Sequence, residues 1–445
     1  MRIKQKGWQN QTGIVILVCI FFISLVCAFT FFEPEPYPLK YPANFGGRFT
    51  IPEDNPVTRE GVALGRKLFY EELLSANNKI SCASCHQQAL AFSDNRQFSI
   101  GVDGTPTRRN SMSLSNLLWV KNFFWDGRST SLEALAVVPL TDPHEMGQSL
   151  EASSRKLNAS KNYPSLFEKA FGTPHINADR IVKALAQFER TLISGNSKYD
   201  QYLTGSYQPT ESERRGILLF SRGMRMDTNQ RGGNCLHCHS IPKTFSETFH
   251  NNGLDEVPLD FGREDFTGMQ EDRARFRVPT LRNIEVTGPY MHDGRFKTLR
   301  EVLDHYSDHI KPSATLSPFI AGVTEQQIYS LALTPEEKQD IVNFMLMLTD
   351  TDFLNNPEFS DPEYKTLAMK LLRILILAFI SVALLMGPSY AQEFITIEGE
   401  VTRVLKLSIK DLEKYPVAEI KIKDQKGEEH VYRGTALSVL LDSAG

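Results

Sequence analysis

The sequence has no excess of charge of either sign and contains few cysteines. Its 445 residues carry 49 lysines and arginines against 53 aspartates and glutamates, a formal net charge of −4. This balance lacks the basic surplus that attracts nucleic-acid phosphates, so no nucleic-acid partner is expected. Only six cysteines are present, and four of them stand in two short motifs. Function is therefore expected from local sites rather than from bulk charge.

The two motifs are copies of C-x-x-C-H, in "SCASCH" (81–86) and "NCLHCH" (234–239). Thiols one helical turn apart can form thioethers to two haem vinyl groups while the next histidine ligates the iron, so the pattern is typical of c-type haem attachment. Structural zinc and a redox disulfide are the alternatives. Zinc ribbons place their CxxC pairs much closer together, and neither motif stands in a βαβ context. We predict two covalently bound haem c groups, held by Cys82, Cys85 and His86 and by Cys235, Cys238 and His239.

An uncharged apolar run from Gly13 to Phe32 follows a basic N-terminal stretch. Its length suits a membrane-spanning helix, and the basic flank predicts that the N-terminus lies inside. No small-x-small cleavage site follows the run, which favours an anchor over a cleaved signal peptide. With either reading, the body of the protein is predicted on the periplasmic side of a bacterial inner membrane.

The chain repeats itself around the two C-x-x-C-H motifs. "GVALGRKLF" (61–69) precedes the first motif, and "RGILLFSRG" (215–223) precedes the second. Downstream, "WDGRSTSLEAL" (125–135) matches "HDGRFKTLREV" (292–302). The repeat predicts two haem domains that derive from one ancestral unit.

The apolar spacing in 178–193 and 335–348 indicates amphipathic helices. Thr334 is predicted to cap the second helix, because a proline and acidic residues follow it. The predicted fold class is therefore mainly α. The predicted order is a signal-anchor helix and linker (1–40), a first haem c domain (41–205), a second haem c domain (206–352), a linker (353–368), a signal-peptide-like or second transmembrane segment (369–391) and a truncated β-rich domain (392–445).

The repeat also predicts a chemical difference between its two halves. Pro139 follows Trp125 by 14 residues, and Tyr306 follows His292 by 14 residues. Tyrosine can offer a phenolate oxygen to iron, whereas proline has no side-chain donor. If this position faces the iron, the first haem keeps an open position for chemistry and the second is closed for electron transfer. The alternative is that Pro139 only shapes a turn and Tyr306 is a core residue.

The order of these motifs resembles the bacterial di-haem cytochrome c peroxidase and MauG superfamily over about 45–350. The resemblance is carried by the two C-x-x-C-H motifs and by "GVDGTPTRRNSMSLSN", "FFWDGRSTSLEA", "PLTDPHEMG" and "VPTLRNIEVTGPYMHDGRFKTLREVLDHY". It implies that the N-terminal haem reacts with hydrogen peroxide and the C-terminal haem transfers electrons. It also implies Trp125 as the relay between the haems, Glu145 as the distal acid–base group, and a calcium ion held by Asn110, Thr287 and Pro289.

Two departures from the typical peroxidases of the superfamily point to its MauG branch. Val102 stands where those enzymes carry a histidine that blocks the first haem, and Tyr306 stands where they carry a methionine ligand. The resemblance thus implies a first haem that is open in the fully ferric protein. His305 and Met291 are alternative ligands of the second haem, and His292 is expected to bond a propionate or a backbone group.

Three functions remain open from the sequence. The first is peroxide reduction with electrons from a small cytochrome c or a cupredoxin. The second is MauG-like oxidation of residues in a partner protein, and the third is electron transfer without catalysis. Family resemblance also implies a homodimer.

The C-terminal tail has a different character. "MKLLRILILAFISVALLMGPSYAQ" (369–392) has the basic start, apolar centre and small-residue end of a secretory signal, which suggests that two reading frames are joined here. The rest alternates like strands, with a short helix expected in "KDLEKYP" (410–416). It resembles the opening of a sulfite-oxidase-like molybdopterin domain, but no cofactor-binding residue can be named.

Overall fold

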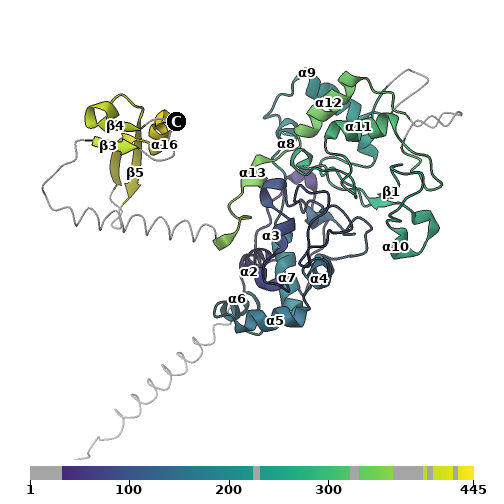
Figure 1. Ribbon diagram of the computed structural model, residues 1–445, viewed down its shortest axis with the longest axis horizontal. Coiled ribbons are helices and arrows are strands. Elements are labelled where there is room, and N and C mark those ends of the chain that lie inside the picture. Colours follow the sequence, from purple (N-terminus) through teal and green to yellow (C-terminus); the bar gives the residue numbers. More distant parts are fainter. Residues whose placement is uncertain are drawn as a thin grey trace, which may run out of the picture. The chain divides into compact units, whose positions relative to one another are not determined.

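The computed structural model describes residues 33–223, 231–320, 330–363, 394–397, 404–423 and 429–444. The chain forms two compact units, Met1–Tyr364 and Lys365–Gly445 (Figure 1). Within the described ranges, no helix is both long enough and apolar enough to cross a membrane. The predicted anchor at 13–32 and the segment at 369–391 lie outside these ranges.

The first unit is mainly helical, as predicted, and each of its halves is built on one pair of packed helices. In the first half, α2 (Arg59–Phe69) packs on α7 (Ala178–Glu189). In the second half, α9 (Glu211–Ser221) packs on α12 (Pro335–Leu346). The two predicted amphipathic helices are thus confirmed, and Thr334 caps α12 by accepting a hydrogen bond from Glu337 N at 3.2 Å.

A glycine lets the two helices of each pair approach closely. A Cβ on Gly65 of α2 would lie 1.8 Å from the carbonyl oxygen of Ala184, and a Cβ on Gly216 of α9 would lie 2.0 Å from that of Asp340. Real atoms cannot approach so closely, so any side chain here would force the helices apart. The two glycines therefore set the same helix packing in both halves.

Replacing Gly216 with alanine should lower the free energy of unfolding by about 1–3 kcal/mol, the usual cost of overpacking. At an exposed helix position the same change stabilises, because alanine is the better helix former. Denaturant unfolding of the haem-loaded protein measures the effect, with Leu218→Ala on the exposed face of α9 as the control. A variant as stable as the parent would contradict the close packing of α9 and α12.

Each half has its own hydrophobic core. Phe69, Phe92 and Phe188 lie within the core of the first half, and Phe220 and Phe344 lie within that of the second. The other helices and strands of this unit are shorter or lie around these cores. They are α3 (Cys82–Cys85), α4 (Leu132–Thr141), α5 (Leu150–Ala159), α6 (Tyr163–Phe171), α8 (Lys198–Leu203), α10 (Glu264–Thr267), α11 (Leu299–Asp308), α13 (Thr351–Asn355), β1 (Phe249–His250) and β2 (Phe276–Arg277).

The matching segments of the repeat have matching backbone structure. Ser131 caps α4 and Thr298 caps α11, each by accepting a hydrogen bond from the amide three residues on. Asn116 and Asn283 both adopt a left-handed backbone, with φ of 63° and 61°. Each starts a short 3₁₀ turn, Leu117–Trp119 and Ile284–Val286 respectively. The repeat predicted from the sequence is therefore present in the fold. The boundary between the two haem domains at 205 and 206 stays a prediction.

The second unit contains two antiparallel hairpins. Strand β3 (Phe394–Ile397) pairs with β4 (Leu405–Ser408), and β5 (Val417–Lys423) pairs with β6 (Glu429–Thr435). Helix α15 (Ile409–Leu412) lies where the short helix was expected, and α16 (Leu437–Ala444) supplies Leu440 to a small core. No function is assigned to this unit.

Candidate haem sites and the wall between them

The first C-x-x-C-H motif forms one helical turn. Helix α3 spans Cys82–Cys85, and Ser84 Oγ accepts a hydrogen bond from Ser81 N at 3.0 Å. His86 N donates to Cys82 O at 2.9 Å, which places the imidazole directly after the turn. The imidazole Nδ1 lies 2.7 Å from Phe92 O. An N–H on Nδ1 that donates to this carbonyl leaves Nε2 free to bind a metal.

The second motif folds in the same way. Cys235–His237 forms a 3₁₀ turn after Asn234, which adopts a left-handed backbone with φ of 53°. His239 N donates to Cys235 O at 2.8 Å, the counterpart of the bond made by His86. His239 Nδ1 lies 3.1 Å from Thr244 O, so this imidazole also keeps Nε2 available.

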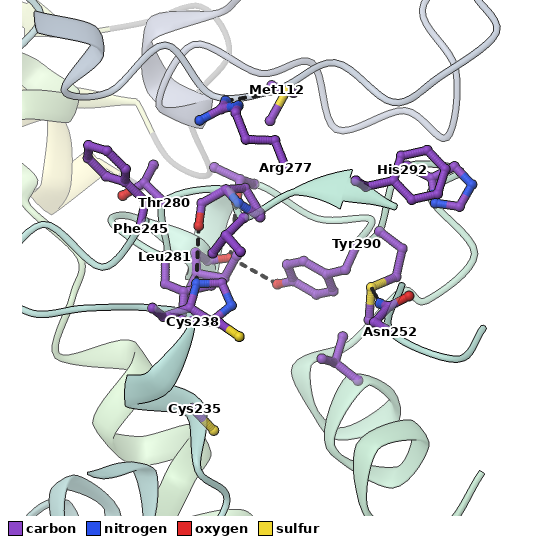
Figure 2. A pocket seen from close by; sticks show the side chains of 18 of the residues that line it. Met112, Cys235, Cys238, Phe245, Asn252, Arg277, Thr280, Leu281, Tyr290 and His292 are labelled. Atoms are coloured by element: carbon purple, nitrogen blue, oxygen red, sulfur yellow. Dashed lines mark hydrogen bonds between the residues drawn. The ribbon is translucent and has the colours of Figure 1, made fainter. Parts of the chain in front are cut away.

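The residues around the second motif fit a haem c group. Cys235, Cys238 and His239 line one cavity, together with many apolar side chains (Figure 2). The four cysteines of the two motifs form no disulfide, so their thiols are available for thioether bonds. A haem needs an apolar cavity, two thiols and an imidazole with a fixed second nitrogen, and this cavity supplies all three.

The cavity also contains the predicted distal ligand. Tyr306 on α11 and Met291 both line it, and Asn252 Nδ2 lies 3.2 Å from Tyr306 Oη and 3.3 Å from Met291 Sδ. Burial raises the pKa of Tyr306 to about 12, and the hydrogen bond from Asn252 opposes this shift. His305 is not part of the cavity wall, since its Nε2 lies 3.0 Å from the backbone oxygen of Asn252. Tyr306 and Met291 thus have the position for ligation, and the choice of Tyr306 stays a prediction.

The first half has no comparable donor at the matching position. Pro139 lies inside α4, eight residues after its cap Ser131, and Tyr306 lies eight residues after the cap Thr298. The equivalent helical positions of the two halves therefore carry a residue without a donor and a residue with a phenol.

Glu145 lies in the turn after α4, with its side chain half-buried. Its carbonyl oxygen accepts a hydrogen bond from Val102 N at 2.7 Å, which joins it to the loop that carries Val102. Burial raises the pKa of the carboxyl group, Asp142 adds to the shift, and Arg128 opposes it. The carboxylate also raises the pKa of both Cys82 and Cys85 through its charge, so it lies near the first motif.

The wall between the two halves is built by reciprocal backbone hydrogen bonds. Asn110 N donates to His292 O at 2.7 Å, and Arg277 N donates to Trp125 O at 2.7 Å. In the repeat, Asn110 is equivalent to Arg277, and Trp125 is equivalent to His292. The Trp125 and His292 rings contact edge to face, with centroids 6.5 Å apart, and both side chains line the cavity of the second motif. Trp125 thus lines the cavity of the second motif, and its role as a relay between the haems stays a prediction.

His292 makes no side-chain hydrogen bond within the described ranges. Its ring stacks on Phe276 with centroids 3.7 Å apart, and burial lowers its pKa to about 4. The imidazole is therefore neutral near pH 7. The predicted propionate or backbone partner of His292 stays a prediction.

The three predicted calcium ligands lie together. Asn110, Thr287 and Pro289 all line the same cavity, and Asn110 Nδ2 donates to Arg96 O at 2.8 Å. The described residues contain no cluster of three His, Cys, Asp or Glu side chains that could hold a metal. The predicted calcium set uses amide and backbone oxygens instead, so calcium stays a prediction.

Glu189 and Arg277 are among the buried charged groups that sequence reasoning missed. Glu189, the last residue of α7, is buried with Oε2 unpartnered, and burial raises its pKa to about 8. It follows Leu185 by four residues, so the helical period could have placed it on the buried face. Arg277 is also buried and lies in the cavity wall, but only the fold brings it there.

Comparison with known proteins gives consistent results. The family model described as di-haem cytochrome c peroxidase matches residues 59–208. The methylamine utilization protein MauG of Methylorubrum extorquens is 36% identical over 298 residues, which cover 66% of this chain and 79% of the relative. The cytochrome c551 peroxidase of Nitrosomonas europaea is 34% identical over 56% of this chain and 73% of its own length.

A solved structure agrees with these relatives. A MauG-like protein associated with microbial copper homeostasis superposes with a TM-score of 0.66 and 34% identity, covering 73% of this chain and 99% of that one. The di-haem cytochrome c peroxidase family implies two c-type haems, in agreement with the two C-x-x-C-H motifs of this chain. From its fold, its haem motifs and these relatives, the chain belongs to the di-haem cytochrome c peroxidase and MauG family.

Proposed function

We propose that the protein reduces hydrogen peroxide at the N-terminal haem with electrons that a small cytochrome c or cupredoxin delivers to the C-terminal haem. The observation that carries this proposal is the difference between Pro139 and Tyr306 at equivalent positions of α4 and α11. A site without a protein donor admits peroxide, whereas a site with a phenol in the cavity does not.

The haems supply the iron at which peroxide reacts and the reversible one-electron chemistry. The chain supplies the proton transfer and the path between the haems. Glu145 accepts a proton from one peroxide oxygen and returns it to the other, so that this oxygen leaves as water. Burial raises the pKa of Glu145 above that of an ordinary glutamate, which makes the carboxylate a better base for the first of these proton transfers. Trp125 lies in the wall between the halves and provides the relay.

Mixing the fully ferric protein with peroxide tests the proposal. Electron paramagnetic resonance should show one high-spin and one low-spin haem at rest, and peroxide should deplete both signals without prior reduction. Two low-spin signals at rest, with no response to peroxide, would support electron transfer without catalysis instead.

Replacing Tyr306 with methionine should raise the reduction potential of the low-spin haem, because an oxygen ligand favours ferric iron more than a thioether does. Spectroelectrochemistry measures the potential, and the high-spin haem is the internal control. An unchanged potential would exclude Tyr306 as the ligand and leave Met291, which also lines the cavity.

A second candidate function is the oxidation of residues in a partner protein. It is favoured by Tyr306 in the cavity and by Val102 in the loop beside Glu145. The relative from Methylorubrum extorquens is named a methylamine utilization protein, and the present proposal includes no role in methylamine utilization. Slow decay of the peroxide-oxidised state with reduced small redox proteins, and fast decay with a specific partner, would favour this function.

We also propose that a calcium ion binds between the halves at Asn110, Thr287 and Pro289. The presence of all three residues in the lining of one cavity supports this, because oxygen donors suit a hard cation. Removal of calcium with a chelator should slow electron transfer between the haems, and added calcium should restore it. Stopped-flow absorbance measures the rate, and a metal analysis without calcium would contradict the site.

We propose a periplasmic location with the apolar run at 13–32 as the membrane anchor. Two motifs for c-type haem and the basic flank of the run support this location. Fractionation of cells tests it, since a cleaved signal would release the protein from the membrane. A homodimer is likewise a prediction, which sedimentation of the holoprotein checks.

A further inference from the structure

The side chain of Arg277 is a buried cation without a carboxylate partner. Arg277 is 5% exposed, and its Nε donates to Phe124 O at 3.2 Å. Its Nη2 lies 3.7 Å from Met112 Sδ, a weak acceptor. No carboxylate of the described residues lies within 4.0 Å of its nitrogens. Burial lowers its pKa to about 10, so the guanidinium remains charged near pH 7.

A charge in this environment needs a counter-ion, because burial of an unpaired ion is costly. Glu247 is the acidic group that acts on Arg277 through space. Its Oε2 accepts hydrogen bonds from Asn122, from the backbone N at 3.0 Å and from Nδ2 at 2.9 Å. Its Oε1 is buried without a hydrogen-bond partner among the described residues, and it forms no ion pair with Arg277 within 4.0 Å. His292 is neutral near pH 7 and cannot balance the charge. Most N–H groups of the Arg277 guanidinium thus have no strong acceptor among the described residues.

The position of Arg277 identifies the missing anion. Arg277 lines the same cavity as His239, and in Figure 2 it lies at the opposite end from Cys235 and Cys238. In a haem the two vinyl groups and the two propionates lie on opposite edges of the ring. Thioether bonds to Cys235 and Cys238 therefore direct the propionates toward the end of the cavity that contains Arg277.

We propose that Arg277 holds a propionate carboxylate of the haem attached at Cys235 and Cys238. A guanidinium fork matches a carboxylate with two parallel hydrogen bonds. The backbone of Arg277 is fixed on both sides, since its N donates to Trp125 O at 2.7 Å and its residue pairs with Phe249 in the β1–β2 ladder. The cation is thereby held beside the relay tryptophan.

The repeat does not duplicate the positive charge of Arg277. Asn110 is the counterpart of Arg277 in the repeat, since the two make the reciprocal backbone bonds to His292 and Trp125. Asn110 is neutral, and its amide donates to Arg96 O at 2.8 Å. The position of the first half that is equivalent to Arg277 therefore carries no charge. The charge of Arg277 favours the ferrous state of the second haem.

Arg277→Gln and Arg277→Lys test the proposal in the holoprotein. Arg277→Gln should lower the reduction potential of the low-spin haem and shift the propionate-bending band in the resonance Raman spectrum. Arg277→Lys should keep the potential near that of the parent but still shift the band, because lysine keeps the charge and loses the fork. Arg275→Gln is the matched control, since Arg275 is partly exposed and lies 3.8 Å from Asp272.

A fully haem-loaded Arg277→Gln variant with the parental potential and Raman band would overturn the proposal. If that variant fails to acquire both haems, the Raman band of Arg277→Lys decides, and an unchanged band overturns the proposal. These readouts report on the second haem at rest. They therefore stay informative even if the protein proves inactive toward peroxide.

Discussion

Glu145→Gln should slow the reaction with peroxide by about one hundred- to ten thousand-fold, the usual contribution of a positioned acid–base group. Glutamine preserves the shape of the side chain but cannot accept the proton. Both haems should remain attached, because Glu145 belongs to neither C-x-x-C-H motif. Stopped-flow absorbance of the ferric protein with excess peroxide measures the rate.

The pH dependence provides a second readout of the same group. Burial raises the pKa of Glu145, so its carboxylate form is lost at a higher pH than for an ordinary glutamate. The rate in the parent should therefore fall as the pH drops through this raised pKa, and Glu145→Gln should lack that step. Glu151→Gln, at the exposed start of α5, is the matched control. A parental rate in Glu145→Gln would show that another group moves the proton.

Asp200→Asn should lower the free energy of unfolding by about 3–5 kcal/mol, because it leaves a buried arginine without its counter-ion. Arg282 is fully buried, and its Nη2 donates to Asp200 Oδ1 at 2.8 Å while Nη1 contacts the other carboxylate oxygen. Arg282 Nε also donates to Pro242 O at 2.9 Å. The pair thus joins α8 to the segments that contain Pro242 and Arg282.

Denaturant unfolding of the holoprotein measures this loss, and an exposed ion pair provides the control. Asp54→Asn removes a partner of Lys183 at 2.9 Å, and this loss should be much smaller than that of Asp200→Asn because water screens the exposed aspartate. A double change, Asp200→Leu with Arg282→Met, should recover much of the stability, since it removes both charges. Equal losses for Asp200→Asn and Asp54→Asn would show that burial does not strengthen the pair.

The sequence predicted those features that depend on local spacing. The C-x-x-C-H turns, the cap of α12 by Thr334 and the equivalence of Pro139 with Tyr306 all follow from residues close together in the chain. The sequence alone left His305 as an alternative to Tyr306, and the structure of α11 distinguishes the two residues. Neighbours on a helix differ by about 100° in direction, so one residue faces the cavity and the next turns away.

Features that depend on distant segments could not be predicted in this way. Arg277 stands in an ordinary run of residues, and its role as a buried cation arises only because β2 lies against Trp125. The helical period could place Glu189 on the buried face of α7, but the lack of a partner for its Oε2 among the described residues depends on how α7 packs against other segments. Spacing along one chain contains no information on such contacts between segments, whereas the repeat did indicate which positions are equivalent.

Backbone hydrogen bonds in both directions connect the two halves across the wall between them. Asn110 depends on a carbonyl from the later half, and Arg277 depends on one from the earlier half. A protein cut between them would leave each fragment with a buried backbone group that has lost its acceptor. Neither fragment is therefore expected to be as stable as the intact protein.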